Sequence, residues 1–239
     1  MKTAVKPAAA SGTGKYEALL ERCRKLSPVP TAVAHPCEAS ALSGAVEAAR
    51  LKLIVPLLVG PAAKIREIAK EAKLDLGGLE IIDTPHSHAS AARAVELVRE
   101  GRAEVLMKGS LHSDEILGAI VSREKGLRTG RRVSHAFIMD VPTYHKVLVV
   151  TDAAISIAPT LEDKVDIIQN AIDLAVSLGV SKPKVAILAA VETVTSKMPA
   201  TIDAAALCKM AERGQIRGGI LDGPLAFDNA ISLDAAQIK

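Results

Sequence analysis

Short apolar runs alternate with amphipathic stretches along most of the chain, and this alternation constrains the fold more than any other feature. The runs that predict strands are TAVAH 31–35, IVPLLVG 54–60, LEIID 79–83, EVLMKG 104–109, VSHAFIMD 133–140, KVLVVTDA 146–153, KVAILAAVE 184–192 and GGILDGPLA 218–226. Apolar residues three and four positions apart predict helices at about 15–26, 38–51, 62–73, 87–100, 113–125, 161–178 and 201–213. Strands and helices in this order are typical of an α/β fold with a largely parallel sheet.

The alternation of strands and helices is interrupted at residues 133–153. Two strand-like runs follow each other with only VPTYHK between them, which is too short for a helical crossover. We therefore expect an antiparallel hairpin here, and with it a change of sheet. The sequence then predicts a flexible tail at 1–14, a first α/β domain at 15–133 and a second α/β domain at 134–239.

The helix predicted at 161–178 has a clear apolar face and a clear end. Gly179 follows the last periodic residue and Pro183 lies shortly beyond it, and both are typical of a helix stop. The residues expected on the buried face are Leu161, Val165, Ile168, Ile172, Ala175 and Val176.

Composition restricts the class of protein. Of 239 residues 49% are hydrophobic, yet there are only two Tyr, two Phe and no Trp, so the core is expected to be aliphatic. The net charge of +3 is spread along the chain, and the basic stripe and stacking aromatics of nucleic-acid readers are missing. Three distant cysteines suggest neither a zinc cage nor a disulfide framework, which favours a cytoplasmic location. We expect no signal peptide and no membrane span.

Ligands of open α/β sheets bind beyond the carboxyl ends of the strands, so the strand-end loops are the first places to look for chemistry. In EVLMKGSLHSDEI, Lys108, Ser110, His112 and Ser113 lie between a strand and the start of a helix. A helix N-terminus and a lysine suit a phosphate or carboxylate. The alternative is structural: Ser110 or Ser113 caps the helix and Lys108 is solvated.

The segment GLRTGRRVSHAFIMD places three arginines before an apolar run. Arginine matches phosphate oxygens with its planar fork, although a loop of arginines is often a solvated surface. We expect Arg128 and Ser134 to belong to an anion site, and Arg131 and Arg132 to be exposed. His135 is either a further site residue or a hydrogen-bonded core histidine.

Carboxylates follow three other strands. Asp152 and Asp222 precede turns, and Glu192 precedes a Ser/Thr-rich loop in which Thr201 is the expected N-cap of the next helix. Such carboxylates serve as a general base or orient one, or else they cap turns through Asx-type hydrogen bonds. The chain lacks a GxxxxGK[ST] loop, a GxGxxG after a strand, a GxSxG elbow and a metal-ligand spacing.

Several of these loops together resemble a known family. The segments MKGSLHSDE, KGLRTGRRVSHAFIMD, TDAAISIAPTLEDKVDIIQNA, AVETVTSKMPATIDAAALCKM and RGQIRGGILDGPLAFDNAIS are similar to those of the phosphate acetyl/butyryltransferases. Within that family they most resemble the phosphate butyryltransferases and the phosphate acetyltransferase part of enoyl-CoA hydratase fusions. The resemblance runs from about residue 15 to the last residue.

The resemblance implies two α/β domains with a cleft between them, as in isocitrate and isopropylmalate dehydrogenases. It implies reversible transfer of a short acyl group, acetyl or butyryl, between coenzyme A and phosphate. Coenzyme A is then a substrate, no cofactor is bound permanently, no metal is needed, and the protein is a homodimer or larger homo-oligomer. The residues expected to bind phosphate or coenzyme A are Lys108, Ser110, His112, Ser113, Arg128, Ser134, His135, Asp152, Glu192 and Asp222.

One part of the family pattern is not matched. The family's catalytic residues are a Ser-Arg pair and a nearby Asp in a final segment that also completes the first domain, and we expect this segment to lie beyond Lys239. The only Ser-Arg here is Ser122-Arg123, inside a predicted helix, and an arginine of some relatives falls near Gly118. We therefore expect a C-terminally truncated chain with an incomplete first domain, exposed apolar sheet edge, tight oligomerisation or poor solubility, and little activity. The alternative is a catalytically silent acyl-CoA or anion-binding protein; a dehydrogenase on the same fold is less favoured.

Overall fold

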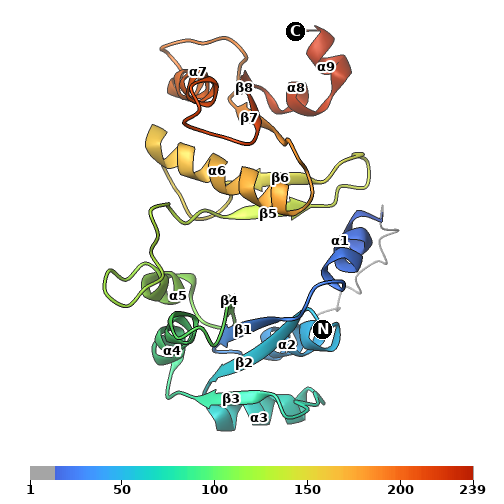
Figure 1. Cartoon of the computed structure of the whole chain (residues 1–239), viewed down its shortest axis with the longest axis vertical. Coiled ribbons are helices and arrows are strands. Elements are labelled where there is room, and N and C mark those ends of the chain that lie inside the picture. The colour runs from blue at the N-terminus through green and yellow to red at the C-terminus, as the bar shows by residue number, and fades with distance from the viewer. Residues whose placement is uncertain (1–13, 239) are drawn as a thin grey trace, which may run out of the picture. The chain divides into compact units, whose positions relative to one another are not determined.

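The computed structural model describes residues 14–238 and divides into two compact units (Figure 1). One unit runs from Glu17 to Gly130, and the other comprises the chain from Arg131 onward together with the residues up to Tyr16. The expected domain boundary at 133–134 lies close to this division, but Lys15 and Tyr16 group with the second unit.

Two predictions concern the ends of the chain. The tail predicted at 1–14 lies, except for Gly14, outside the described residues. The family's catalytic Ser-Arg pair and Asp are expected beyond Lys239, and Lys239 itself lies outside the described residues. Both expectations therefore stay predictions.

The unit of residues 17–130 is built on a four-stranded parallel sheet of order β3-β2-β1-β4. Its strands are β1 Val29–Ala34, β2 Ile54–Gly60, β3 Glu80–Asp83 and β4 Val105–Lys108, and its helices are α2 Ala39–Arg50, α3 Ala62–Glu71, α4 Ser87–Arg99 and α5 Ser113–Ile120. Helix α1 Lys15–Cys23 precedes them. The predicted parallel α/β fold is confirmed.

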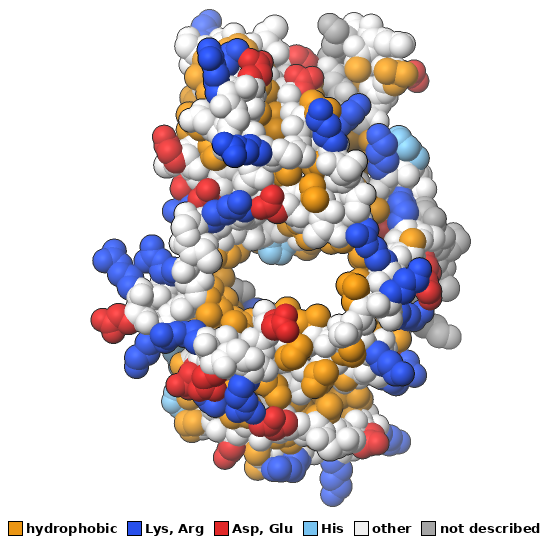
Figure 2. Space-filling model, in the orientation of Figure 1, with side chains coloured by type: hydrophobic (Ala, Val, Ile, Leu, Met, Phe, Trp, Pro, Cys, Tyr) orange, Lys and Arg blue, Asp and Glu red, His pale blue; other side chains and the backbone are white. Residues whose placement is uncertain are grey.

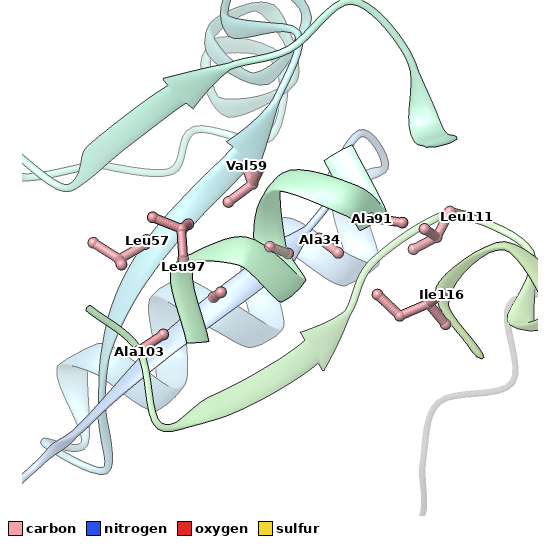
Figure 3. Close-up of a cluster of buried hydrophobic side chains, with 10 residues drawn as sticks. Ala34, Leu57, Val59, Ala91, Leu97, Ala103, Leu111 and Ile116 are labelled. Carbon is pink, nitrogen blue, oxygen red and sulfur yellow. The ribbon is translucent and has the colours of Figure 1, made fainter. Parts of the chain in front are cut away.

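Helices cover both faces of this sheet. On one face Val33 and Leu58 pack with residues of α2 and α3. On the other, Ala34, Leu57 and Val59 pack against α4 and α5, as Figure 3 shows. Because successive side chains of a strand point to opposite faces, β1 and β2 need apolar residues at nearly every position. Their sequences, apolar except for the buried Thr31, are explained by this double coverage.

The strand order has one reversal, and it lies between β1 and β4. From β1 the chain moves through α2 to β2 and then to β3, whereas β4 returns to the opposite side of β1. The helix that follows β1 is on one face of the sheet and the helix that follows β4 is on the other. Such a switch point leaves a crevice at the carboxyl ends of its two strands, which is the usual ligand position in open α/β sheets.

The unit that starts at Arg131 contains two small sheets. Strands β5 Ala136–Met139 and β6 Leu148–Thr151 form the antiparallel hairpin that the sequence predicts, with Phe137 opposite Val150. Strands β7 Lys184–Leu188 and β8 Ile220–Leu225 are parallel. The helices are α6 Leu161–Ser177, α7 Pro199–Glu212, α8 Phe227–Ile231 and α9 Leu233–Ile238. The last two helices were not predicted.

Helix α6 supplies much of this unit's core. Ile168 and Ile172 are buried together with Leu207 of α7, as the periodicity predicted. Val176 was expected on the same face but is 44% exposed, because it lies about 100° around the helix from the buried Ala175. Gly179 has the left-handed φ of 91° expected after a helix C-terminus.

Two helix boundaries differ from the prediction. Helix α5 ends at Ile120, so Ser122 and Arg123 lie in a turn and not in a helix. The turn closes when Leu127 N–H donates to the Ile120 carbonyl, at 2.8 Å, with Gly126 packed so closely that a Cβ there would lie 2.3 Å from the same oxygen. Only glycine fits at residue 126. The turn therefore closes and ends α5, although the apolar periodicity predicted a helix as far as residue 125.

Helix α7 begins earlier than expected, at Pro199, and its N-cap is Met198. Proline is favoured at the first helical position, where its missing N–H is not needed. Thr201 is therefore not the N-cap. Its buried hydroxyl donates to the carbonyl of Thr195 or of Met198, and it accepts from Thr195 N–H. Thr201 thus fixes the loop before α7 from inside the helix.

No helix among the described residues is long and apolar enough to cross a membrane. On the face shown in Figure 2, basic and acidic side chains are interspersed, with no stripe of one sign. This distribution agrees with the small net charge.

Candidate active site

The carboxyl ends of β1 and β4 approach each other unusually closely, and Gly109 makes this possible. A Cβ atom at Gly109 would lie 2.4 Å from the Ala34 carbonyl oxygen and 2.5 Å from that of His35. Gly109 N–H instead donates to the Ala34 carbonyl at 2.8 Å. Any side chain at residue 109 would therefore separate the two strand ends.

Ser110 joins the two strand-end loops. Its hydroxyl donates to the His35 carbonyl at 2.9 Å and accepts from Cys37 N–H at 3.0 Å. Its own N–H donates to the same carbonyl. Ser110 is therefore not the helix cap of the structural alternative, but a bridge between the loop after β4 and the loop after β1.

His35 is the residue around which these loops are arranged. It has a left-handed φ of 53°, and its ring Nδ1 lies 3.1 Å from Ser90 Oγ of α4. Ser90 is fully buried and also contacts Thr84 Oγ1 at 2.8 Å. Burial of the ring, followed by the charge of Lys64, holds the pKa of His35 below its usual range.

Glu115 organises the start of α5. It accepts hydrogen bonds from His112 N–H at 3.0 Å and Ser87 Oγ at 2.8 Å, and His88 Nδ1 lies at 2.9 Å. The Ser87 hydrogen bond is the main cause of a lowered pKa of Glu115. His112, rather than Ser110 or Ser113, is the N-cap residue, and both His112 and Ser113 have exposed side chains.

The cationic candidates differ in their surroundings. Lys108 and Arg128 are exposed, and within residues 14–238 the Arg128 side chain has no ion pair or hydrogen bond. Arg131 forms an ion pair with Asp173 at 2.5 Å, and Arg132 forms one with Asp163 at 2.9 Å. Arg131 and Arg132 are exposed as expected, but both are held by acidic residues of α6.

In the second unit, Asp152 is engaged by the backbone. Its carboxylate accepts from the N–H groups of His135, Ala154, Ile155 and Ser156 at 2.9–3.2 Å. Partial burial favours the protonated form, but hydrogen bonds from Ser156 and the other N–H groups outweigh it and lower the pKa of Asp152 to about 2. Of the two readings, turn capping describes this carboxylate better than a general base.

Ser134 and His135 lie beside this loop. Asn170 Nδ2 of α6 donates to Ser134 Oγ at 3.0 Å, so Ser134 is held in place. The His135 ring meets Phe137 edge-on, with centroids 4.5 Å apart. Its Nδ1 is buried and has no hydrogen-bond partner among the described residues, so it is not the hydrogen-bonded core histidine of the structural alternative.

Glu192 follows β7. Asp222 was predicted to follow a strand as well, but it lies inside β8, opposite Ala186, because the pairing with β7 continues to Leu225. Asn229 of α8 donates from Nδ2 to Glu192 Oε1 at 2.8 Å, which ties α8 to the loop after β7. Asp222 is exposed and accepts a hydrogen bond from Gly223 N–H at 2.9 Å. Across residues 14–238 no group of three or more His, Cys, Asp and Glu is arranged to hold a metal ion.

Comparison with known proteins decides the family. The family model described as "Phosphate acetyl/butaryl transferase" matches residues 88–239, which is more than half of the chain. The chain belongs to the phosphate acetyl/butyryltransferase family. Its relatives are transferases that move an acyl group between coenzyme A and phosphate.

Individual members of the phosphate acetyl/butyryltransferase family agree with this assignment. A phosphate acetyltransferase of Rhizobium meliloti is 61% identical over 225 residues, 94% of this chain and 71% of that protein. A phosphate butyryltransferase of Clostridium beijerinckii is 40% identical over 224 residues, 94% of this chain and 74% of that protein. The chain spans 63% or 64% of three further relatives named phosphate acetyltransferase.

A solved structure of the family supports the fold. The branched-chain phosphotransacylase from Enterococcus faecalis V583 matches with a TM-score of 0.72 and 26% identity, covering 88% of this chain and 73% of that one. The mixed α/β fold with a parallel sheet is therefore that of the phosphotransacylases.

The structure adds residues that sequence reasoning did not select. From the sequence, His35 was predicted to belong to the strand TAVAH and Ser90 to the helix at 87–100. Asn229 was assigned to no predicted element. A histidine directly after an apolar run and before Pro36 was a usable signal, since it marks a strand end. No sequence signal connects Ser90 to His35, because their contact depends on the packing of α4 on β1.

Proposed function

We propose that this protein transfers an acetyl group between coenzyme A and phosphate, so that acetyl-CoA and phosphate give acetyl phosphate and free coenzyme A. Family membership together with 61% identity over 94% of the chain to a phosphate acetyltransferase carries this proposal. The acetyl preference is supported by the difference between that value and the 40% identity to a phosphate butyryltransferase.

Within this function, the loops after β1 and β4 are proposed to bind a phosphoryl group. The switch-point position, the exposed Lys108 and the bridging Ser110 support this role. Arg128 is the proposed additional cation, because its guanidinium is not held by a carboxylate among the described residues. His112 and Ser113, exposed at the start of α5, are retained as candidates for the same group.

In the second unit, Ser134, His135, Glu192 and Asp222 remain proposed contacts to phosphate or coenzyme A. Asp152 is assigned a positioning role, because its carboxylate holds the backbone of residues 152–156. Thiol deprotonation needs a base. A carboxylate with a pKa of about 2 is a weak one.

Several finer expectations stay proposals. These are an isocitrate dehydrogenase-like arrangement with an interdomain cleft, a cytoplasmic location, a homodimer or larger homo-oligomer, and no permanently bound cofactor. Exposed apolar side chains on the β5–β6 hairpin, among them Phe137 at 51% and Val150 at 45%, support self-association.

The test is release of coenzyme A thiol from acetyl-CoA and from butyryl-CoA, each with and without phosphate, with acetyl phosphate trapped as its hydroxamate. Release that depends on phosphate and is faster with acetyl-CoA supports the proposal. Binding of coenzyme A in calorimetry without any release would favour the catalytically silent binder instead.

A further inference from the structure

We propose that His35 is a ligand-binding residue whose Nε2 atom takes up a proton when a phosphoryl group binds at the carboxyl ends of β1 and β4. The inference rests on the proposed function, which supplies the ligand class: inorganic phosphate or a phosphate of coenzyme A. The proton comes from solvent, and no covalent bond of the ligand changes.

A count of protons around Ser90 fixes the tautomer of His35. Three groups contact Ser90 Oγ: the His86 carbonyl at 3.0 Å, Thr84 Oγ1 at 2.8 Å and His35 Nδ1 at 3.1 Å. A serine hydroxyl has one proton, and a carbonyl can only accept. All three contacts are hydrogen bonds only if Ser90 donates to His86 while Thr84 and His35 both donate to Ser90. The proton of the neutral His35 ring is therefore on Nδ1.

The other ring nitrogen is then an acceptor without a partner. Nε2 of His35 is not among the buried unpaired atoms, and no hydrogen bond to it is formed by residues 14–238. Nε2 therefore keeps some solvent-accessible surface, while Nδ1 is anchored through Ser90. An imidazole oriented in this way can accept a proton and then donate it to an anion.

The backbone of His35 supports a functional reading. Three residues other than glycine have positive φ in the described chain: His35, Lys52 and Lys73. Lys52 and Lys73 directly follow the C-caps of α2 and α3, where a left-handed residue is common. His35 instead ends a buried strand, and a non-glycine residue held in this conformation away from a helix end is typical of functional sites.

Charges around the ring decide its state with and without ligand. The charges of Lys64 in α3 and His86 before α4 lower the pKa of His35, whereas the charge of Glu115 in α5 raises it. Burial is the larger cause and acts in the same direction as the two cations, so the pKa of the empty ring lies below its usual value and the neutral form predominates near pH 7. A phosphoryl group beside Nε2 adds negative charge, and this favours the imidazolium. The ring is neutral when empty and charged when the ligand is bound.

Calorimetry of phosphate and coenzyme A binding, in buffers of different ionisation enthalpy at about pH 7, measures the protons taken up. The decisive variant is His35→Asn. Asparagine tolerates left-handed φ, and its amide can replace Nδ1–H as donor to Ser90, but it does not titrate. We expect the unsubstituted chain to take up roughly half to one proton more than His35→Asn and to bind about threefold to tenfold more tightly.

A second variant keeps the test independent of the fold of His35→Asn. Lys64→Gln alters an exposed side chain and removes the cation that opposes protonation, so proton uptake should fall because more of the free ring is already charged. Uptake seen only with coenzyme A assigns the phosphoryl group to that molecule, and uptake with phosphate alone assigns it to phosphate.

Equal affinity and equal proton uptake in the unsubstituted chain and His35→Asn would overturn this inference while leaving acyl transfer intact. Absence of both binding and phosphate-dependent thiol release in the unsubstituted chain would overturn the proposed function, and this inference with it.

Discussion

The carbonyl oxygen of His35 accepts hydrogen bonds from both the backbone N–H and the hydroxyl of Ser110, each at 2.9 Å. These two residues are far apart in sequence, and their contact joins the loops after β1 and β4. The candidate site of the first unit depends on this contact, because the same loops contain Lys108 and the His35 ring.

Ser110→Ala removes the hydroxyl that bridges His35 and Cys37. Two hydrogen bonds are lost, and Cys37 N–H keeps only its second acceptor, the His35 carbonyl at 2.7 Å, so we expect a loss of about 1–3 kcal/mol in the free energy of unfolding. Urea denaturation followed by circular dichroism measures it. Ser113→Ala is the control, since that exposed side chain has no hydrogen bond among the described residues. A similar loss in both variants would contradict the bridging role.

Gly109→Ala places a methyl group against two backbone carbonyls, at 2.4 Å and 2.5 Å. The backbone must shift, so we expect destabilisation of about 3 kcal/mol or more, or failure to fold. The matched control is Gly118→Ala in α5, where a Cβ meets nothing within 4 Å and alanine is the better helix former by about 1 kcal/mol. Thermal melting of the two variants should show changes of opposite sign.

Asp152→Asn tests the positioning role through pH. Because folding lowers the pKa of Asp152 from 3.8 to about 2, its stabilisation is fully present above pH 3.8 and is lost as the pH falls through about 2. We expect Asp152→Asn to cost about 1–2 kcal/mol at neutral pH, after allowance for solvent screening. Denaturation at neutral pH and at about pH 3 should show a smaller difference from the unsubstituted chain in acid.

The control for this experiment is Asp222→Asn, because Asp222 is exposed and, within the described part of the chain, its carboxylate accepts only from the adjacent Gly223. It should change stability by less than about 0.5 kcal/mol. An Asp152→Asn penalty that stays the same between neutral pH and acid would show that the carboxylate charge does not hold the loop.

Arg128→Ala and Arg131→Ala separate the anion-binding cation from the structural one. Arg131 pairs with Asp173 at side-chain exposures of 48% and 51%, so its removal should cost at most about 1 kcal/mol and leave phosphate affinity unchanged. Arg128→Ala should weaken binding of phosphate or coenzyme A by about tenfold at low salt, less at high salt. Equal affinities of the two variants would exclude Arg128 from the site.

Much of the fold could be predicted because local patterns specify it. The alternation of short apolar runs with amphipathic stretches predicted a parallel α/β sheet, and VPTYHK predicted the β5–β6 hairpin. Gly179 predicted the end of α6 through its left-handed backbone. In each case the cause lies within a few residues, so the sequence alone contains it.

The errors have causes that lie farther away. Helix α5 stops at Ile120 because Leu127 and Gly126 close a turn on it. Helix α7 starts at Pro199, and Thr201 instead forms hydrogen bonds with the backbone of Thr195. Similarly, the three arginines are alike in sequence. Only the position of Asp163 and Asp173 on α6 distinguishes Arg131 and Arg132 from Arg128.

The sequence by itself determined the types and order of the strands and helices and, through its motifs, the phosphate acetyl/butyryltransferase family. Hydrophobic periodicity and turn residues are local properties of a chain, and they need no knowledge of what packs where. The tertiary structure decided which strand ends meet, and so brought Ser90 to the His35 ring and Ser110 to its carbonyl. These contacts depend on strand order and helix packing. They fix the tautomer of a histidine that, in the sequence, looked like no more than the end of a strand.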